Sequence, residues 1–356
     1  MKVLIAAGGT AGHIIPALAV AEELLKEDKN TDILFLTSRK KQDLEFIKSK
    51  NFRVLRIFAG KARRYFSFYN FTDIFLIIFG FFQSFFIILK FKPQVIFSKG
   101  GYISLPVVFA GRVLGKRVIA HESDLVLGLA NKVCLPFIYK LAVSFPLEVY
   151  KDINSKKLIF SGNPTRKLIS ENKTGNANTL LVIGGSQGAR NINYAVYELL
   201  DDLLEKFKVI HLVGESDYSH FKEKKGSLEK DKALNYILLT TVFDEKEFNN
   251  LINESFVVVS RAGAGAISEF SLLAKPTIFV PLLGHQEENA EYLSKKGAAV
   301  IIKDKDLTPD ILKEKIQLLF SDNNLRNNLI KNISKFSCPN ASSILAKEII
   351  KAQKSA

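Results

Sequence analysis

Cysteine is scarce in this chain of 356 residues, which contains only Cys134 and Cys338. The two lie far apart, neither belongs to a C-x-x-C pair, and no histidine stands near them. This pattern supports neither a disulfide framework nor a zinc site, and it is typical of a reducing compartment. The first apolar run begins at residue 3, which leaves no room for a signal peptide, so we expect a cytoplasmic protein.

Long apolar runs and two common nucleotide motifs are missing as well. The longest apolar stretch, residues 74–89, has 16 residues, whereas a membrane-spanning helix needs about 20. We therefore do not expect a spanning helix. The glycine turn at residues 8–12 has neither the G-x-G-x-x-G spacing of dinucleotide-binding folds nor the Gly-Lys-Ser/Thr ending of a P-loop.

The first 26 residues contain a strand, a glycine turn and a helix, in that order. Residues 3–7 are a short apolar run of the kind found in buried parallel strands, and residues 16–26 have the pattern of an amphipathic helix. Glycines between them allow a sharp turn and close approach of a ligand, and the amides of the helix start favour an anion. His13, one of five histidines, stands at the mouth of this turn.

The same pattern starts again in the second half of the chain. A strand is predicted at residues 180–183, a glycine turn at 184–189 and a helix at 193–204. Strands alternating with helices in two similar halves predict an α/β protein of two doubly wound Rossmann-like domains facing a cleft, where a ligand binds. We expect domains at residues 1–162 and 163–340 and a closing helix within 341–356. Further strands are predicted at 33–36, 54–57, 94–98, 118–120, 157–160, 209–214, 236–239, 256–259 and 277–281.

Basic charge is concentrated in the first half. The net charge is +14; residues 1–162 hold 24 Lys and Arg against 12 Asp and Glu, and the remaining residues hold 26 against 24. Nucleic acid or an anionic membrane surface would each suit such a half. A nucleic-acid groove interleaves basic residues with stacking aromatics, whereas the aromatics here cluster in residues 74–89, so we expect no nucleic acid.

The apolar stretch 74–89 has two interpretations. At helical spacing Gly80, Gln83 and Ser84 share one face, and Phe, Ile and Leu cover the rest. Such a helix can be buried in the core, or it can lie in a lipid interface with basic residues around it. The flanking residues Lys61, Arg63, Arg64, Lys90 and Lys92 favour the interface. The expected membrane contacts are Ile74, Phe75, Ile78, Phe79, Phe82 and Phe86.

Seven short motifs occur in a specific order. They are GGTAGH at 8–13, KGGYISLP at 99–106, HESD at 121–124, GNPTR at 162–166, GGSQGA at 184–189, SRAGAGAISE at 260–269 and HQEENA at 285–290. With all seven, the chain resembles the MurG family of peptidoglycan glycosyltransferases. Members move N-acetylglucosamine from UDP-N-acetylglucosamine to lipid I, the undecaprenyl-pyrophosphoryl-N-acetylmuramyl-pentapeptide. The resemblance implies the glycosyltransferase B fold, with the last helix returning to the N-terminal domain.

The resemblance also implies that the C-terminal domain binds the sugar donor. Glu269 resembles the carboxylate that accepts hydrogen bonds from the ribose hydroxyls. By the same resemblance, Ser186 and the helix start at 263–268 lie near the diphosphate. Arg166 stands near the same leaving group, and Gln286 contacts the sugar. The expected donor contacts are Thr10, Ala11, Gly12, Asp124, Arg166, Ser186, Phe243 (beside the uracil), Gly263, Ala264, Gly265, Ala266, Ile267, Ser268, Glu269 and Gln286.

His13 matches the histidine proposed as general base in this family. It would deprotonate the acceptor hydroxyl, so that the hydroxyl attacks the anomeric carbon and the configuration inverts without a covalent intermediate. Helix starts and Arg166 would stabilise the leaving diphosphate, so we expect no metal and no cofactor. Tyr102, Ser104 and Glu122 are the expected acceptor contacts.

Two positions depart from the family pattern. Ala11 replaces a usual glycine, and HESD replaces the usual HEQN, which puts Asp124 where an asparagine amide is expected. A carboxylate near a diphosphate is unfavourable, so we expect Asp124 to bind a hydroxyl.

The resemblance implies a peripheral protein on the cytoplasmic face of the inner membrane, with other cell-wall synthesis proteins among its partners. One alternative is another UDP-sugar enzyme of the same fold, a glycolipid glycosyltransferase or a UDP-N-acetylglucosamine 2-epimerase; an epimerase needs no lipid-facing helix. The other is a non-catalytic, peripheral membrane nucleotide-binding protein, which needs no base such as His13.

Overall fold

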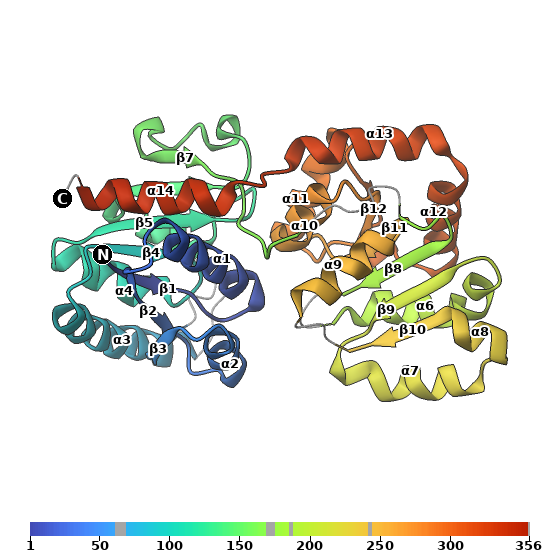
Figure 1. Ribbon diagram of the computed structural model, residues 1–356, viewed down its shortest axis with the longest axis horizontal. Coiled ribbons are helices and arrows are strands. Elements are labelled where there is room, and N and C mark those ends of the chain that lie inside the picture. The colour runs from blue at the N-terminus through green and yellow to red at the C-terminus, as the bar shows by residue number, and fades with distance from the viewer. Residues whose placement is uncertain (61–68, 169–174, 185–187, 241–243, 355–356) are drawn as a thin grey trace. The chain divides into compact units, whose positions relative to one another are not determined.

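The computed structural model describes the whole chain except residues 61–68, 169–174, 185–187, 241–243 and 355–356 (Figure 1). It divides into two compact units. The first comprises Met1–Arg166 and Cys338–Ala356, and the second comprises Lys167–Ser337. Each unit has its own parallel β-sheet with helices on both faces, as the alternation of strands and helices predicted.

The sheet of the first unit has seven parallel strands in the order β3-β2-β1-β4-β5-β6-β7. β1 lies in the interior of the sheet, where Ile5 pairs with Phe35 of β2 on one side and with Phe97 of β4 on the other. These three side chains are fully buried, because helices cover both faces of the sheet. The strands are β1 (Lys2–Ala6), β2 (Asp32–Thr37), β3 (Arg53–Arg56), β4 (Val95–Ser98), β5 (Arg117–Glu122), β6 (Lys140–Val143) and β7 (Leu158–Phe160).

The C-terminal helix completes the core of this unit. Leu345 and Ile349 of α14 are buried in the same cluster as Leu24 of α1, and the Arg117 guanidinium donates to the Ala352 carbonyl at 2.9 Å. α14 therefore lies beside α1, although the second unit separates them in sequence (Figure 1). The helices of the unit are α1 (Ala11–Glu27), α2 (Lys41–Ser49), α3 (Tyr69–Phe91), α4 (Ser104–Val113), α5 (Leu129–Cys134) and α14 (Ala341–Lys354).

The second unit has six parallel strands in the order β10-β9-β8-β11-β12-β13. The strands are β8 (Thr179–Ile183), β9 (Lys208–Leu212), β10 (Tyr236–Leu239), β11 (Val257–Ser260), β12 (Thr277–Phe279) and β13 (Val300–Ile301). The helices are α6 (Arg190–Leu204), α7 (Glu215–Ser227), α8 (Lys230–Asn235), α9 (Glu245–Glu254), α10 (Ala264–Leu272), α11 (His285–Lys295), α12 (Pro309–Ser321) and α13 (Asn323–Ile333).

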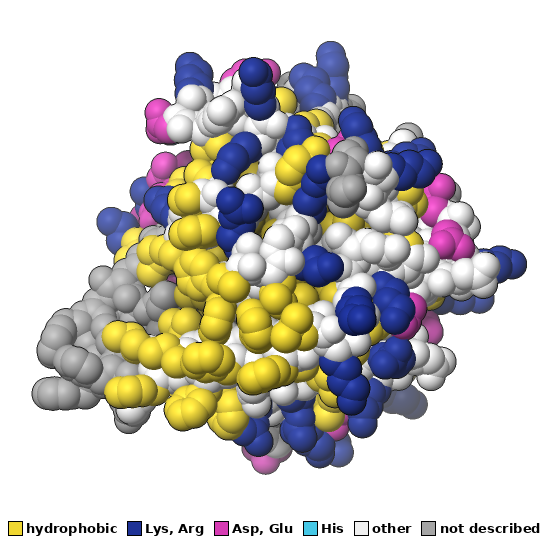
Figure 2. Space-filling model, turned by 90° about the vertical axis from the view of Figure 1, so that its left-hand side faces the viewer, with side chains coloured by type: hydrophobic (Ala, Val, Ile, Leu, Met, Phe, Trp, Pro, Cys, Tyr) yellow, Lys and Arg dark blue, Asp and Glu magenta, His cyan; other side chains and the backbone are white. Residues whose placement is uncertain are grey.

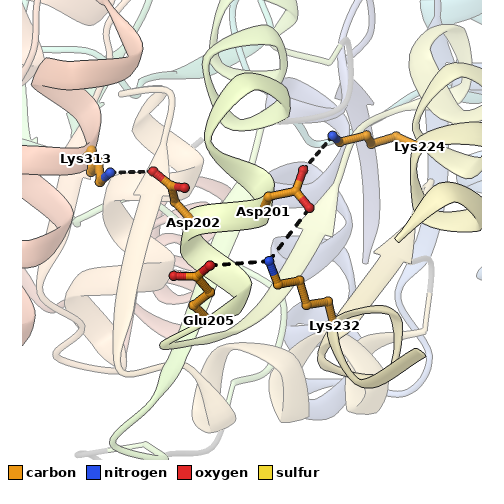
Figure 3. Close-up of polar contacts among 6 residues, drawn as sticks. All are labelled: Asp201, Asp202, Glu205, Lys224, Lys232 and Lys313. Atoms are coloured by element: carbon orange, nitrogen blue, oxygen red, sulfur yellow. Dashed lines mark hydrogen bonds and ion pairs between the residues drawn. The ribbon is translucent and has the colours of Figure 1, made fainter. Parts of the chain in front are cut away.

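Acidic side chains of α6 and of its C-cap residue meet lysines of three other helices (Figure 3). The six residues are Asp201, Asp202, Glu205, Lys224, Lys232 and Lys313. Lys224 of α7 reaches Asp201 at 2.7 Å, Lys232 of α8 reaches Glu205 at 3.4 Å, and Lys313 of α12 pairs with Asp202. All six are partly exposed, so these pairs contribute little to the stability of the fold.

Four elements differ from the sequence predictions. α1 begins at Ala11 and not at residue 16, because Thr10 takes the N-cap position and Pro16 lies inside the helix. His13 therefore belongs to the first helical turn. The apolar helix α3 is longer than the stretch 74–89. β6 and β13 were not predicted.

Candidate active site

The site of the first unit lies at the reversal of its strand order. Strands run outward in both directions from β1 and β4, so the turns after these two strands flank the position where α/β sheets bind ligands. Both turns depend on glycine: φ is +96° at Gly9, +91° at Gly100 and +74° at Gly101. This left-handed backbone brings the two turns close together.

His13 lies between these turns. A Cβ at Gly101 would lie 3.1 Å from His13 Cε1, so the ring packs directly on the backbone of the second turn. His13 Nδ1 is 3.3 Å from Thr10 Oγ1. Burial and the charge of Lys99 lower the pKa of His13 to about 4, against a hydrogen bond from the ring to the Gly8 carbonyl that raises it. The imidazole is therefore neutral at pH 7 and able to accept a proton.

Side chains from the neighbouring loop hold the first turn. Asp43 is buried and accepts from the Gly9 amide at 2.7 Å and from the Ser38 hydroxyl. Lys40 Nζ donates to the Gly9 carbonyl at 2.7 Å, and the Tyr102 ring lies against Gly9. The Gly9 amide is thus already bonded to a carboxylate. The expectation that the amides of the helix start, from Ala11 onward, favour an anion stays a prediction. The sequence analysis did not identify Asp43.

The three expected acceptor contacts have different surroundings. Tyr102 is partly exposed, and burial raises its pKa. Ser104 is fully buried and accepts from Ser98 Oγ at 2.7 Å. Glu122 is also buried; it accepts from Asn131 Nδ2 at 2.9 Å and from three backbone amides of residues 123–128. Contact of these side chains with an acceptor stays a prediction.

The expected donor contacts of the first unit come from three places. Thr10, Ala11 and Gly12 form the start of α1, where Gly12 is exposed. Asp124 follows β5 at the same edge of the sheet. Arg166 is the last residue of the segment Met1–Arg166, the longer of the two segments that form this unit.

The second unit repeats the arrangement. Its strand order reverses between β8 and β11, so the turn after β8 and the start of α10 flank the reversal. Gly263 is the N-cap of α10, which begins at Ala264 and includes the expected contacts Gly265, Ala266 and Ile267. A Cβ at Gly263 or Gly265 would meet nothing within 4 Å. There is therefore open space beside the backbone of this helix start at Gly263 and Gly265.

Three further expected donor contacts lie on α10 and α11. Ser268 Oγ donates to the Ala264 carbonyl at 2.7 Å, and Glu269 in the next position is 9% exposed. Gln286, the second residue of α11, is partly exposed and accepts from the Leu282 amide at 3.1 Å. Ser186 and Phe243 lie outside the described residues.

Arg261, not identified from the sequence, ties these loops together. It is buried, donates to the Val280 carbonyl at 3.0 Å and pairs with Asp304. Asp304 begins a D-x-D triplet with Asp306, but its carboxylate is engaged by Arg261 and by Asn191. In the part of the chain that the structure describes, no three His, Cys, Asp or Glu side chains are grouped so as to hold a metal ion.

The helix α3 has its apolar side outward. Gly80 and Ser84 are buried against α4 and residue 58, Ser84 Oγ donates to the Gly80 carbonyl, and Gln83 accepts from the Phe58 amide. The expectation that these residues share a face is confirmed, and it is the face turned inward. The exposed apolar residues are Ile74 (54%), Phe75 (62%), Ile78 (46%), Phe79 (61%), Phe82 (53%), Phe86 (64%) and Leu89 (45%).

Figure 2 shows this side of the molecule, with an apolar area bordered by Lys and Arg side chains. Lys90 and Lys92 at the end of α3 are exposed, whereas Lys61, Arg63 and Arg64 lie outside the described residues. By length and composition alone, Thr72–Phe91 is the single helix among the described residues that could cross a membrane. The expectation that this stretch is too short is therefore wrong.

Three histidines with lowered pKa values predict a pH-dependent stability. Burial lowers the pKa of His13 to about 4, that of His211 to about 3 and that of His121 well below 6.5. Below pH 6.5 the unfolded chain binds protons that the folded chain does not bind, so the free energy of unfolding falls on acidification. The fall is roughly 1.4 kcal/mol at pH 5.5 for each of His13 and His211. Denaturant titrations at pH 7.5 and 5.5 measure it. In His211→Gln the fall in the free energy of unfolding between these two pH values is smaller by the contribution of one histidine. Equal stability of the unaltered protein at both pH values would contradict the prediction.

The fold alone defines a class. A solved structure of MurG from Acinetobacter baumannii superposes with a TM-score of 0.77 at 23% identity, covering 98% of this chain and 99% of that one. UDP-GlcNAc 2-epimerase from Neisseria meningitidis bound to UDP-GlcNAc has a TM-score of 0.70 at 14% identity, covering 99% and 100%. The chain has the glycosyltransferase B fold, which transferases and epimerases of nucleotide sugars share.

Sequence comparison identifies the family. The chain matches the glycosyltransferase family 28 N-terminal domain over residues 3–143 and the C-terminal domain of that family over residues 179–343. It is 36% identical over 333 residues to the UDP-N-acetylglucosamine--N-acetylmuramyl-(pentapeptide) pyrophosphoryl-undecaprenol N-acetylglucosamine transferase of Clostridium kluyveri, covering 89% of this chain and 91% of the relative. The transferase of the same name from Treponema denticola is also 36% identical, covering 94% and 92%.

The chain therefore belongs to glycosyltransferase family 28, and the resemblance to the MurG family inferred from the seven motifs is confirmed.

Proposed function

We propose that the protein is an inverting glycosyltransferase that moves N-acetylglucosamine from UDP-N-acetylglucosamine to the muramyl 4-hydroxyl of lipid I, which gives lipid II for peptidoglycan synthesis. The observation that carries the proposal is the position of His13 between the two glycine turns at the strand reversal of the first unit. The transferases of Clostridium kluyveri and Treponema denticola are similar to this chain along nearly its whole length, and their names support these substrates.

His13 acts as the general base. Its imidazole takes the proton of the muramyl hydroxyl while the hydroxyl oxygen forms the new bond to the anomeric carbon. The bond from that carbon to the diphosphate breaks on the opposite side, and its electron pair leaves with UDP. Because attack and departure are on opposite faces, the α-linked sugar of the donor becomes a β-linked sugar.

The second unit binds the donor. The open helix start at Gly263 and Ala264 and the guanidinium of Arg166 stabilise the negative charge that develops on the diphosphate. Glu269 accepts from the two ribose hydroxyls, because a carboxylate offers two oxygens to a vicinal diol. Gln286 contacts the sugar, and Asp124 accepts from a hydroxyl. With the diphosphate held in this way, the reaction needs no cofactor and no metal ion.

The first unit binds the acceptor and the membrane. Lipid I hangs from a polyprenyl chain in the bilayer, so its enzyme must reach the lipid surface. The outward phenylalanines of α3, bordered by lysines and arginines, suit burial in the interface of an anionic membrane. The buried face with Gly80 and Ser84 keeps the helix attached to the unit, so we assign a peripheral position on the cytoplasmic face.

Two incubations test the proposal against the epimerase of the same fold. With donor alone, the protein leaves the configuration of the N-acetylglucosamine unchanged at carbon 2, as ¹H NMR would show. With a short-chain lipid I analogue added, NMR of the product shows a β-linkage. Epimerised donor, or an α-linked product, would refute the proposal.

A further inference from the structure

Lys99 is a buried cation to which the reaction described above assigns no part. It directly follows β4, and its amide extends the β1–β4 pairing by donating to the Ala6 carbonyl at 2.9 Å. The left-handed glycines Gly100 and Gly101 then turn the chain away, while the lysine side chain stays inside at 1% exposure. An ammonium taken out of water costs several kcal/mol unless nearby groups compensate it.

The compensating groups belong to the HESD segment. Lys99 Nζ donates to Ser123 Oγ, and that hydroxyl donates onward to Asn163 Oδ1 at 3.2 Å. Ser123 lies between Glu122 and Asp124 in the sequence. The Lys99 ammonium therefore ends next to a residue that has an acidic neighbour on each side. Its direct partner is a hydroxyl, and the carboxylates act on it through their charge.

The two carboxylates are not equivalent. Glu122 is buried and accepts four hydrogen bonds from Asn131 and from amides of its own loop, which hold its carboxylate in place. Asp124 is partly exposed at the edge of the sheet that carries His13. It is also the position where the resemblance to the MurG family leads us to expect an asparagine amide, and this chain has a carboxylate.

We propose that Lys99 is a positioning residue whose buried charge offsets that of Asp124, so that a site with a carboxylate at position 124 still accepts a nucleotide diphosphate sugar. The inference rests on the proposed function, because it concerns binding of that donor. Without the lysine, the charge of Asp124 repels the diphosphate, and His13 loses the neighbouring positive charge that lowers its pKa.

The mutual electrostatic effects agree with this assignment. Burial lowers the pKa of Lys99 to about 8, and the charges of Glu122 and Asp124 oppose that shift. Lys99 in turn lowers the pKa of His13 and of His121. The charged groups that act on Lys99 thus come from β5 and from the segment after β5, and Lys99 itself acts on His13 of α1 and His121 of β5. Loss of the lysine charge moves the pKa of His13 up toward its ordinary value.

A double-mutant cycle tests the pairing. Methionine matches the length of lysine without its charge, and Asp124→Asn removes the carboxylate. We expect Lys99→Met to lower kcat/KM for UDP-N-acetylglucosamine by roughly tenfold when Asp124 is present, mainly through KM, and by less than about threefold in the Asp124→Asn background. An equal loss in both backgrounds would overturn the proposal.

A second readout does not require activity. NMR titration of the His13 imidazole should give a higher pKa in Lys99→Met than in the unaltered protein, with the thermal unfolding temperature recorded for each variant. An unchanged His13 pKa would also overturn the proposal. If Lys99→Met does not fold, Lys99→Gln, which can still donate to Ser123, carries the same test. Absence of transfer by the unaltered protein would refute the proposed function instead, and the titration would still decide the charge pairing.

Discussion

Replacing His13 with alanine lowers turnover by about 100-fold or more, the effect of losing a general base. The acceptor hydroxyl then has no group to take its proton as it attacks. Donor binding is retained, because the expected contacts to uridine and diphosphate lie mainly in the second unit. Transfer rates with saturating donor and acceptor measure the loss, and titration with UDP-N-acetylglucosamine measures binding.

The matched control is His220→Ala. His220 is exposed on α7, where it stacks on Tyr197 at 4.6 Å between ring centroids, and it belongs to the second unit. This variant keeps the rate of the unaltered protein. Normal turnover in His13→Ala would remove His13 from the mechanism.

Replacing both Phe79 and Phe82 with glutamate abolishes binding to anionic vesicles. The two rings are 61% and 53% exposed on the outward face of α3. Burying one such side chain contributes about 1.5–3 kcal/mol, and two added carboxylates are repelled by anionic headgroups. The partition coefficient should therefore fall by roughly 100-fold or more, as measured by co-sedimentation with vesicles rich in phosphatidylglycerol.

Two controls make this result specific. Leu234→Glu introduces a carboxylate at a leucine of the second unit that is 73% exposed, and it leaves vesicle binding intact. The double variant still glycosylates a water-soluble acceptor analogue, which shows that its site is folded. Unchanged vesicle binding in the double variant would refute the interfacial role of α3.

The fold was largely predictable because its strands are short apolar runs that end in glycine turns. β6 escaped prediction because residues 133–139 before it are also apolar, so no change of pattern marks its start. β13 has only two residues. The start of α1 was placed five residues late because proline favours first turns, whereas here Thr10 caps the helix and Pro16 lies within it.

The candidate site was predictable where its residues belong to short motifs and not where they depend on tertiary contacts. His13 stands in such a motif. Asp43 is 34 positions from the amide it holds, and only the pairing of β1 with β2 brings them together. Lys99 looks in the sequence like an ordinary surface charge, because its burial follows from the turn at Gly100 and Gly101. Arg261 likewise depends on the distant Asp304.

The orientation of α3 illustrates the same limit. The small and polar residues Gly80, Gln83 and Ser84 could be assigned to one face from their spacing alone. Whether that face is turned inward depends on contacts with residue 58 and with α4, which no local pattern records.

The most direct test of the central claim is transfer of radiolabelled N-acetylglucosamine from its UDP donor to a short-chain lipid I analogue, with EDTA present throughout. The account predicts label in the lipid product at a rate that EDTA does not change and that His13→Ala lowers by about 100-fold or more. No label in the lipid, while UDP-N-acetylglucosamine still binds, would contradict it.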